Sequence, residues 1–267
     1  MRQRATLLLD ALDHKFGVLI INITTGDFVA TFKQTRVGGK LVKQLALAAA
    51  LCSAGAAQAG VLNFEGAVSP FTFANETVTD GKYWMTTYGG SEGDLTGRFI
   101  NGADQADSCA GAELKCPANN SSTYYAALAD SYLAFGLESG NSFFFNSFAG
   151  SFIGTGSDVY TRGLLLIDGF NDSGLVSTLQ VALPTAVGGA YNFGNYNLAG
   201  FFDESYTAVR FVGYACDAAG SCVRNMNASN FAIDNIVTTQ IPEPATFGLL
   251  GLGLLGMGAL RRRKQAA

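Results

Sequence analysis

The sequence predicts an all-β fold: an antiparallel β-sandwich of jelly-roll-like type, placed between an N-terminal signal peptide and a single C-terminal transmembrane helix. Two observations on residues 60–240 predict the sandwich. Short runs of aromatic and β-branched residues recur there, and Gly, Asn, Asp and Ser separate them. No long stretch shows the periodicity of an amphipathic helix. Many short strands divided by turn residues are typical of a sandwich.

The individual strands follow from these runs. Ten are expected, at Val61–Phe64, Phe71–Ala74, Tyr83–Tyr88, Tyr132–Leu137, Ser142–Phe148, Val159–Ile167, Val176–Ala182, Ala199–Phe202, Ala208–Tyr214 and Phe231–Thr238. For the stretch Tyr124–Ala129 one or two helical turns are the alternative.

A signal peptide is predicted over residues 38–59. Lys40 and Lys43 precede the apolar run 45–51, and Ala57-Gln58-Ala59 forms an A-x-A cleavage site. This order of basic, apolar and small-residue parts is typical of secretory signals. We expect entry through the Sec translocon and cleavage between Ala59 and Gly60.

Residues 1–37 do not fit a signal peptide, which normally opens a chain. We interpret them as a doubtful upstream extension, with translation beginning near Val37. The alternative is an unusually long basic region of the signal.

The C-terminal tail combines three features in order. Pro242-Glu243-Pro244 is followed by the uncharged apolar stretch 245–260, and then by Arg261, Arg262, Arg263 and Lys264. Sixteen helical residues extend ~24 Å, somewhat less than the roughly 30 Å hydrocarbon layer, which flanking arginines help to cover. Two prolines keep the segment before the span extended. The basic cluster should stay cytoplasmic.

This tail, residues 241–267, resembles the PEP-CTERM sorting signal. The resemblance implies that an exosortase, a membrane-embedded protease, recognises Pro242, Glu243 and Pro244. It also implies a Gram-negative host that makes extracellular polysaccharide. The chain would sit in the inner membrane with a periplasmic domain before processing, and afterwards at the cell surface or in the extracellular matrix.

Four cysteines fall in the exported part, as the close pairs Cys109/Cys116 and Cys216/Cys222. An even count in an exported domain predicts disulfides. We expect the two local pairings, because each closes a short loop rich in small residues. Free buried thiols are the alternative.

Charge and histidine content exclude several functions. Residues 60–240 hold six Lys and Arg against 17 Asp and Glu, a net charge of −11. Such a domain repels phosphates, so no nucleic acid is expected as a partner. The only histidine, His14, precedes the signal peptide. The sequence Gly89-Gly90-Ser91-Glu92-Gly93 therefore has no histidine base and is interpreted as a turn.

Binding sites are less specific. Oxygen-rich residues around Asp168 form one calcium candidate, and Glu65 with Asp234 forms another if the first and last strands of the domain pair. Such pairing is expected because these strands are similar to those of jelly rolls in PEP-CTERM proteins, which resemble carbohydrate-binding modules. Trp84, Tyr83 and Tyr88 are candidates for stacking on sugars.

Together these patterns predict a non-enzymatic, exosortase-sorted protein of the envelope or extracellular matrix, associated with exopolysaccharide in biofilm. A carbohydrate-binding module, with calcium as a candidate cofactor, is the alternative. An acidic glycosidase is a third hypothesis with little support.

Overall fold

The computed structural model describes residues 3–8, 18–24, 27–33, 58–67, 69–105, 109, 113–156, 159–199, 204–224 and 227–241. The chain divides into two compact units, and Ala57–Glu243 forms the larger one. In the smaller unit, β1 (Gln3–Leu8), β2 (Val18–Thr24) and β3 (Asp27–Lys33) make an antiparallel sheet in the order β1-β2-β3. These strands lie in residues 1–37, which we interpret as an upstream extension. Their β-branched residues favour strand formation.

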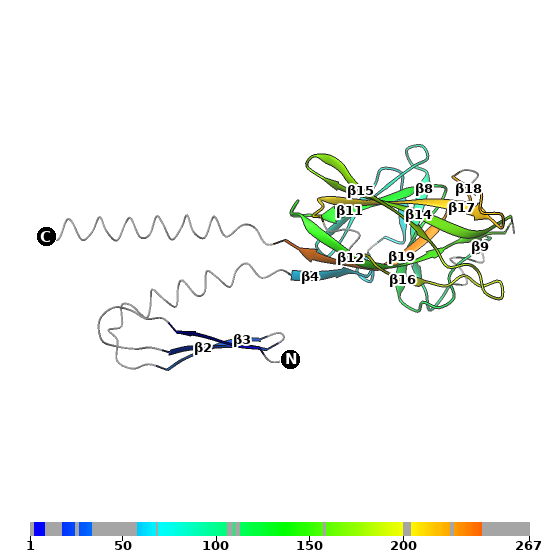
Figure 1. Ribbon diagram of the computed structural model, residues 1–267. Helices are drawn as coiled ribbons and strands as arrows, with labels where there is room; N and C mark the ends of the chain where they lie inside the picture. The colour runs from blue at the N-terminus through cyan, green and yellow to red at the C-terminus, as the bar shows by residue number, and fades with distance from the viewer. Residues whose placement is uncertain are drawn as a thin grey trace. The chain divides into compact units, whose positions relative to one another are not determined.

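The larger unit is an antiparallel β-sandwich, which confirms the predicted fold class at this level (Figure 1). The first sheet has the order β16-β12-β19-β10-β8-β5, and β4 also pairs with β19. Its strands are β4 (Gln58–Leu62), β5 (Phe71–Phe73), β8 (Leu95–Asn101), β10 (Thr123–Ala127), β12 (Phe143–Phe152), β16 (Gly194–Asn197) and β19 (Phe231–Gln240).

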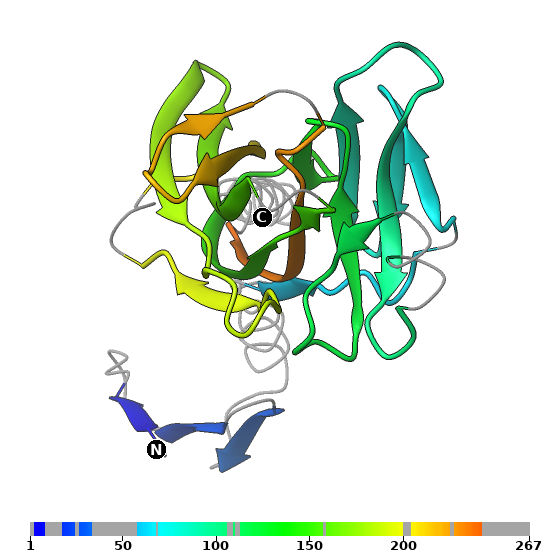
Figure 2. The ribbon, with the colours of Figure 1, turned by 90° about the vertical axis from the view of Figure 1, so that its right-hand side faces the viewer.

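The second sheet has the order β15-β14-β17-β11-β7-β6, and β18 also pairs with β17. Its strands are β6 (Thr77–Asp80), β7 (Tyr83–Tyr88), β11 (Tyr132–Leu137), β14 (Tyr160–Asn171), β15 (Gly174–Ala182), β17 (Ala208–Asp217) and β18 (Cys222–Val223). A small separate pair joins β9 (Leu114–Lys115) to β13 (Gly154–Thr155). In Figure 2 the yellow-green hairpin β14–β15 and the cyan strands near residue 75 lie on opposite sides of the sandwich.

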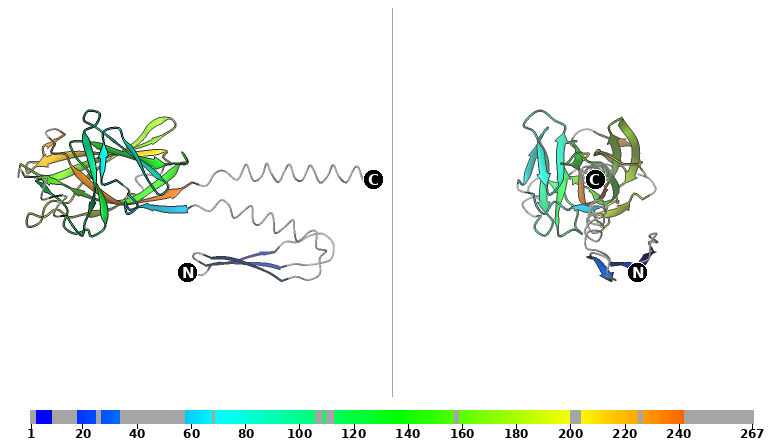
Figure 3. Two further views of the ribbon diagram at one scale, coloured as in Figure 1. Left: turned by 180° about the vertical axis from the view of Figure 1, so that it is seen from behind. Right: turned by 90° about the vertical axis from the view of Figure 1, so that its left-hand side faces the viewer.

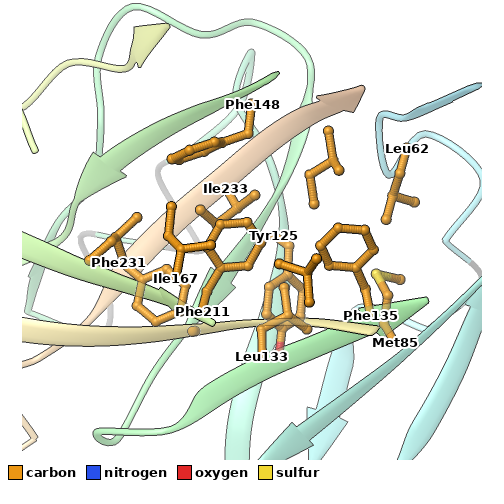
Figure 4. Close-up of a cluster of buried hydrophobic side chains, with 14 of the residues drawn as sticks. Leu62, Met85, Tyr125, Leu133, Phe135, Phe148, Ile167, Phe211, Phe231 and Ile233 are labelled. Carbon is orange, nitrogen blue, oxygen red and sulfur yellow. The ribbon is translucent and has the colours of Figure 1, made fainter. Parts of the chain in front are cut away.

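The core fills the space between the two sheets. Alternate residues of β7, β11 and β17 point inward and meet residues of β10, β12 and β19. Aromatic rings dominate this contact, since Phe211 packs against Phe135, Phe145 and Phe148 at centroid distances of 5.3 to 5.9 Å (Figure 4). Such offset and edge contacts add to the apolar area that the rings bury.

Strand prediction succeeded best for short aromatic runs bounded by turn residues. Tyr83–Tyr88 and Tyr132–Leu137 match β7 and β11. The helical alternative for Tyr124–Ala129 is wrong, because Thr123–Ala127 is strand β10 in the first sheet. Tyr124, Tyr125, Ala126 and Ala127 are all buried, so no alternation marks the strand.

Other boundaries differ from the prediction. Strand β16 at Gly194–Asn197 was not predicted, and the strand expected at Ala199–Phe202 falls mostly on residues 200–203, which are outside the described part. Strands β6 and β8 were not predicted; β6 is short and polar, and in β8 Gly97 and Arg98 interrupt the apolar residues.

The first and last strands of the sandwich pair with each other. In β4 and β19, Gln58 lies opposite Gln240, and Leu62 lies opposite Ile236 (Figures 1 and 3). On the other edge of β19, next to β12, the N–H of Ile241 donates to the carbonyl of Ser142 at 3.0 Å. The described residues include no helix long and apolar enough to cross a bilayer.

Candidate functional site

The outer face of the second sheet carries a group of aromatic rings. On β7 the side chains of Trp84, Thr86 and Tyr88 alternate with core residues and so lie on this outer face. In the register with β11, Trp84 lies opposite Gly136 and Tyr88 lies opposite Tyr132.

Flat groups from four strands stack side by side across this face. Tyr88 and Tyr132 have ring centroids 5.0 Å apart at an interplanar angle of 16°. The Arg210 guanidinium carbon is 5.5 Å from the Tyr132 ring and 5.1 Å from the Phe170 ring. Arg224 also lies 5.5 Å from Tyr132. Cation–π attraction therefore holds Arg210 between two rings.

Arg210 is also paired with Asp168, its cross-strand neighbour on β14. Nη2 and Nε of Arg210 donate to the same oxygen of Asp168 at 2.5 and 3.1 Å. The hydroxyl of Thr178 donates to the other oxygen at 2.8 Å. The Arg210 side chain is 34% exposed, whereas that of Asp168 is 3% exposed. The pair thus places a buried anion beneath a cation that reaches the surface.

The indole of Trp84 packs against the backbone of Gly136 on the neighbouring strand. A Cβ at Gly136 would lie 2.7 Å from one carbon of the indole and 2.5 Å from the carbonyl oxygen of Thr207. Only glycine therefore leaves room for the indole at this point of the sheet. Beyond Gly136 the next residue across the sheet is Ala208, followed by Phe170. Small residues thus separate the two large rings.

A second polar group involves Glu65, Asp80 and Asp234. Oδ2 of Asp234 accepts hydrogen bonds from the side chains of Asn120 and Ser122, both at 2.8 Å. Burial raises the pKa of Asp234, and the hydrogen bonds oppose that shift only in part. Burial also raises the pKa of Asp80, and Glu65 adds to the shifts of both carboxyls.

The predicted calcium residues fall into two separate places. Asp168 lies within β14, and Arg210 and Thr178 already bond to its oxygens, so the stretch after it forms a hairpin instead of an oxygen cage. Glu65 and Asp234 lie beside neighbouring residues of one segment, since Glu65 bonds to Thr123 and Asp234 to Ser122. Both oxygens of Glu65 accept hydrogen bonds from Thr123. Among the described residues no group of three or more His, Cys, Asp or Glu is placed to hold a metal.

The predicted aromatic candidates divide between core and surface. Tyr83 is buried, and its hydroxyl bonds to that of Thr238 at 2.8 Å, so it is unavailable for stacking. Trp84 and Tyr88 lie on the outer face. Tyr132, Phe170 and Arg210 were not predicted, because their pairing depends on strand order. The only sequence signal for these residues was the two-residue alternation of side chains along strands such as β11 and β17.

Both predicted disulfides are present. Cys109 bonds to Cys116, and Cys216 bonds to Cys222. The second links directly opposed residues of β17 and β18. The predicted turn at Gly89–Gly93 connects β7 to β8, and positive φ angles at Gly89, Gly90 and Gly93 explain its glycines.

Of the processing residues, Ala59 and Gly60 lie in β4. A Cβ at Gly60 would lie 2.4 Å from the Tyr83 hydroxyl. Ala57, the sorting residues Pro242, Glu243 and Pro244, and the basic residues Arg261, Arg262, Arg263 and Lys264 lie outside the described residues.

The fold defines a class, the antiparallel β-sandwich proteins, and solved structures of that kind are similar to this chain. A DUF4465 family protein from Bacteroides caccae is 12% identical, with a TM-score of 0.44, over 70% of this chain and 100% of its own. A family 11 carbohydrate-binding module from Clostridium thermocellum, solved with a β-1,3-1,4-mixed-linked tetrasaccharide, is 11% identical, with a TM-score of 0.32, over 70% and 99%. The C-terminal family 22 carbohydrate-binding module of Xyn10B from the same organism is 14% identical, with a TM-score of 0.29, over 68% and 93%. Likenesses this distant give no argument about function.

The tail is more specific. Residues 240–264 match the family model of the PEP-CTERM protein-sorting motif. The chain is therefore a protein with a PEP-CTERM sorting motif, as its sequence predicted. No curated protein sequence matches it.

Proposed function

We propose that this chain is a non-enzymatic protein, sorted by an exosortase to the cell surface or extracellular matrix, where it associates with exopolysaccharide. The single observation that carries the proposal is the PEP-CTERM motif at residues 240–264, which begins at the last residue of β19. The folded sandwich is thus followed at once by the sorting segment. We also propose a jelly-roll-like arrangement of the sandwich, which the pairing of its first strand β4 with its last strand β19 supports.

Each part of the tail has its own task in this proposal. After translocation through Sec, the apolar stretch 245–260 holds the chain in the inner membrane with the sandwich in the periplasm. The cluster Arg261 to Lys264 stops transfer. Pro242 and Pro244 prevent helix from continuing through the junction, so that Glu243 is presented in an extended backbone.

Replacing Pro242, Glu243 and Pro244 by alanine tests the proposal. Alanine has the highest helix propensity, so the extended segment is lost while the span keeps its apolar length. We expect the unprocessed chain to accumulate in the inner membrane, measured by its mass and by fractionation of cells that contain the exosortase. Changing Arg261, Arg262, Arg263 and Lys264 to glutamine is the comparison, and it should impair membrane retention. Processing of the alanine variant at the original rate would contradict sorting by this motif.

A second candidate function is carbohydrate binding by the sandwich, with calcium as a candidate cofactor at Glu65 and Asp234. The observation that favours binding is the stack of Tyr88, Tyr132 and Arg210 beside Trp84 on one sheet face. Glycan binding with and without a calcium chelator tests both parts. A loss of binding on chelation, repeated by Glu65→Gln, is expected if calcium takes part.

A further inference from the structure

We propose that the outer face of the second sheet, centred on Trp84, binds a neutral polysaccharide. In this assignment a pyranose ring stacks on the indole of Trp84, and sugar hydroxyls bond to the Arg210–Asp168 pair. The inference rests on carbohydrate binding as the second candidate function. It adds the site and the chemical class of the ligand.

Trp84 has the properties of a stacking residue. It is the only tryptophan of the chain, and it is half-buried on a sheet face instead of in the core. The backbone at Gly136 supports the indole from below. Within the part of the chain that the structure describes, Nε1 of Trp84 has no hydrogen-bond partner. An indole combines an apolar surface with one polar N–H, which suits a sugar with an apolar C–H face and hydroxyls at its rim.

Polar groups suited to hydroxyls lie two strands away. Arg210 is on β17, and β11 is the one strand between β17 and the β7 strand of Trp84. Two strand spacings and an offset of two residues along β17 separate Trp84 from Arg210 by about 12 Å, which a short oligosaccharide can bridge. Rings on both sides and the two bonds to Asp168 fix the guanidinium. Its Nη1 makes no hydrogen bond to any described residue. A guanidinium held in this way loses little entropy when it donates to a ligand.

Thr79 adds a hydroxyl group near Trp84. Thr79 lies opposite Trp84 in the pairing of β6 with β7, and it is exposed. Thr86 is engaged with Thr77 at 2.7 Å. Between Trp84 and Phe170 stand only Gly136 and Ala208, so the two rings are not covered by a large side chain from the strands between them.

Charge argues for a neutral ligand. Residues 60–240 carry a net charge of −11, which repels an acidic polysaccharide. Asp168 neutralises Arg210, the cation at the centre of the face. Arg224 also lies at Tyr132. The affinity for the glycan should therefore depend little on salt concentration, because the attraction does not rest on unpaired charges that salt screens.

The experiment uses the full chain, purified in detergent. The fluorescence of Trp84, the sole tryptophan, is followed during titration with soluble mixed-linked β-glucan, with xylan and with alginate as the acidic probe. We expect a saturable change with at least one neutral glycan and none with alginate. In native electrophoresis through the same glycan, Trp84→Ala and Arg210→Met should weaken binding by roughly tenfold. Trp84→Phe should lose less, because it keeps a ring.

Phe144→Ala is the matched control, since Phe144 is 38% exposed on β12 of the other sheet. It should bind like the original chain, and melting curves should show that each variant folds. If Trp84→Ala does not fold, the fluorescence titration of the unaltered chain still tests the site. Binding of neutral glycan without a change at Trp84, or equal binding by all variants, would overturn the site and leave carbohydrate binding intact. Salt-sensitive binding of alginate alone would overturn the ligand class. Absence of binding to every glycan would overturn the site together with carbohydrate binding, but not exosortase sorting.

Discussion

Removing Arg210 tests the energetics of the outer sheet face. Arg210→Met keeps much of the side-chain length but leaves the carboxylate of Asp168, which is 3% exposed, without its cation. Breaking a buried ion pair from one side costs about 3–5 kcal/mol, and the partial exposure of Arg210 places the expected loss near the lower end. The lost contacts with Tyr132 and Phe170 contribute about 0.5–1 kcal/mol each. We expect the free energy of unfolding to fall by about 4–5 kcal/mol.

A double-mutant cycle of Arg210 and Asp168 tests whether the buried carboxylate causes this loss of stability. Asp168→Leu removes the buried anion and leaves Arg210 partly solvated, so we expect a smaller loss of about 1–2 kcal/mol. The combination with Arg210→Met should be less destabilising than Arg210→Met alone, because no buried charge remains. Urea unfolding at neutral pH measures all three variants. Losses that add to within about 0.5 kcal/mol would refute the buried-anion explanation.

Two further predictions concern the disulfides and the buried carboxyls. Replacing Cys216 and Cys222 by alanine should lower the free energy of unfolding by about 2 kcal/mol, because the closed loop is short; loss of all folding on thermal melting would contradict this. Burial raises the pKa of Asp80 above 3.8, so the folded protein binds the proton more tightly than the unfolded chain. Stability should therefore fall as pH rises from about 4 through the folded pKa. Asp80→Asn should melt at a higher temperature at pH 7 and show a flatter pH dependence, whereas an unchanged profile would argue against a role for Asp80.

The sequence allowed prediction of short aromatic strands bounded by turn residues, and of segments whose parts follow a set order along the chain. Tyr83–Tyr88 and Tyr132–Leu137 were found because each is a short run rich in aromatic residues with turn residues on both sides. Local cysteine spacing gave both disulfides, and the tail was recognised from its three consecutive parts. All of this information is local.

Non-local information was missing. Strand β10 lies between β19 and β8, and Tyr124, Tyr125, Ala126 and Ala127 are all buried, so periodicity could not distinguish it from a short helix. The meeting of Tyr132 with Arg210 depends on the pairing of β11 with β17. Asp168 in turn looked like one member of an oxygen-rich loop until its cross-strand neighbour was known.

The pairing of β4 with β19 has a mechanical consequence. A protein that is held at its C-terminus receives tension through β19, which bonds to β12 along one edge and to β10 and β4 along the other. A pull along this strand loads many hydrogen bonds at the same time, in shear, instead of opening them one after another. A sandwich held through its C-terminal tail should thus resist unfolding by a pull on that tail.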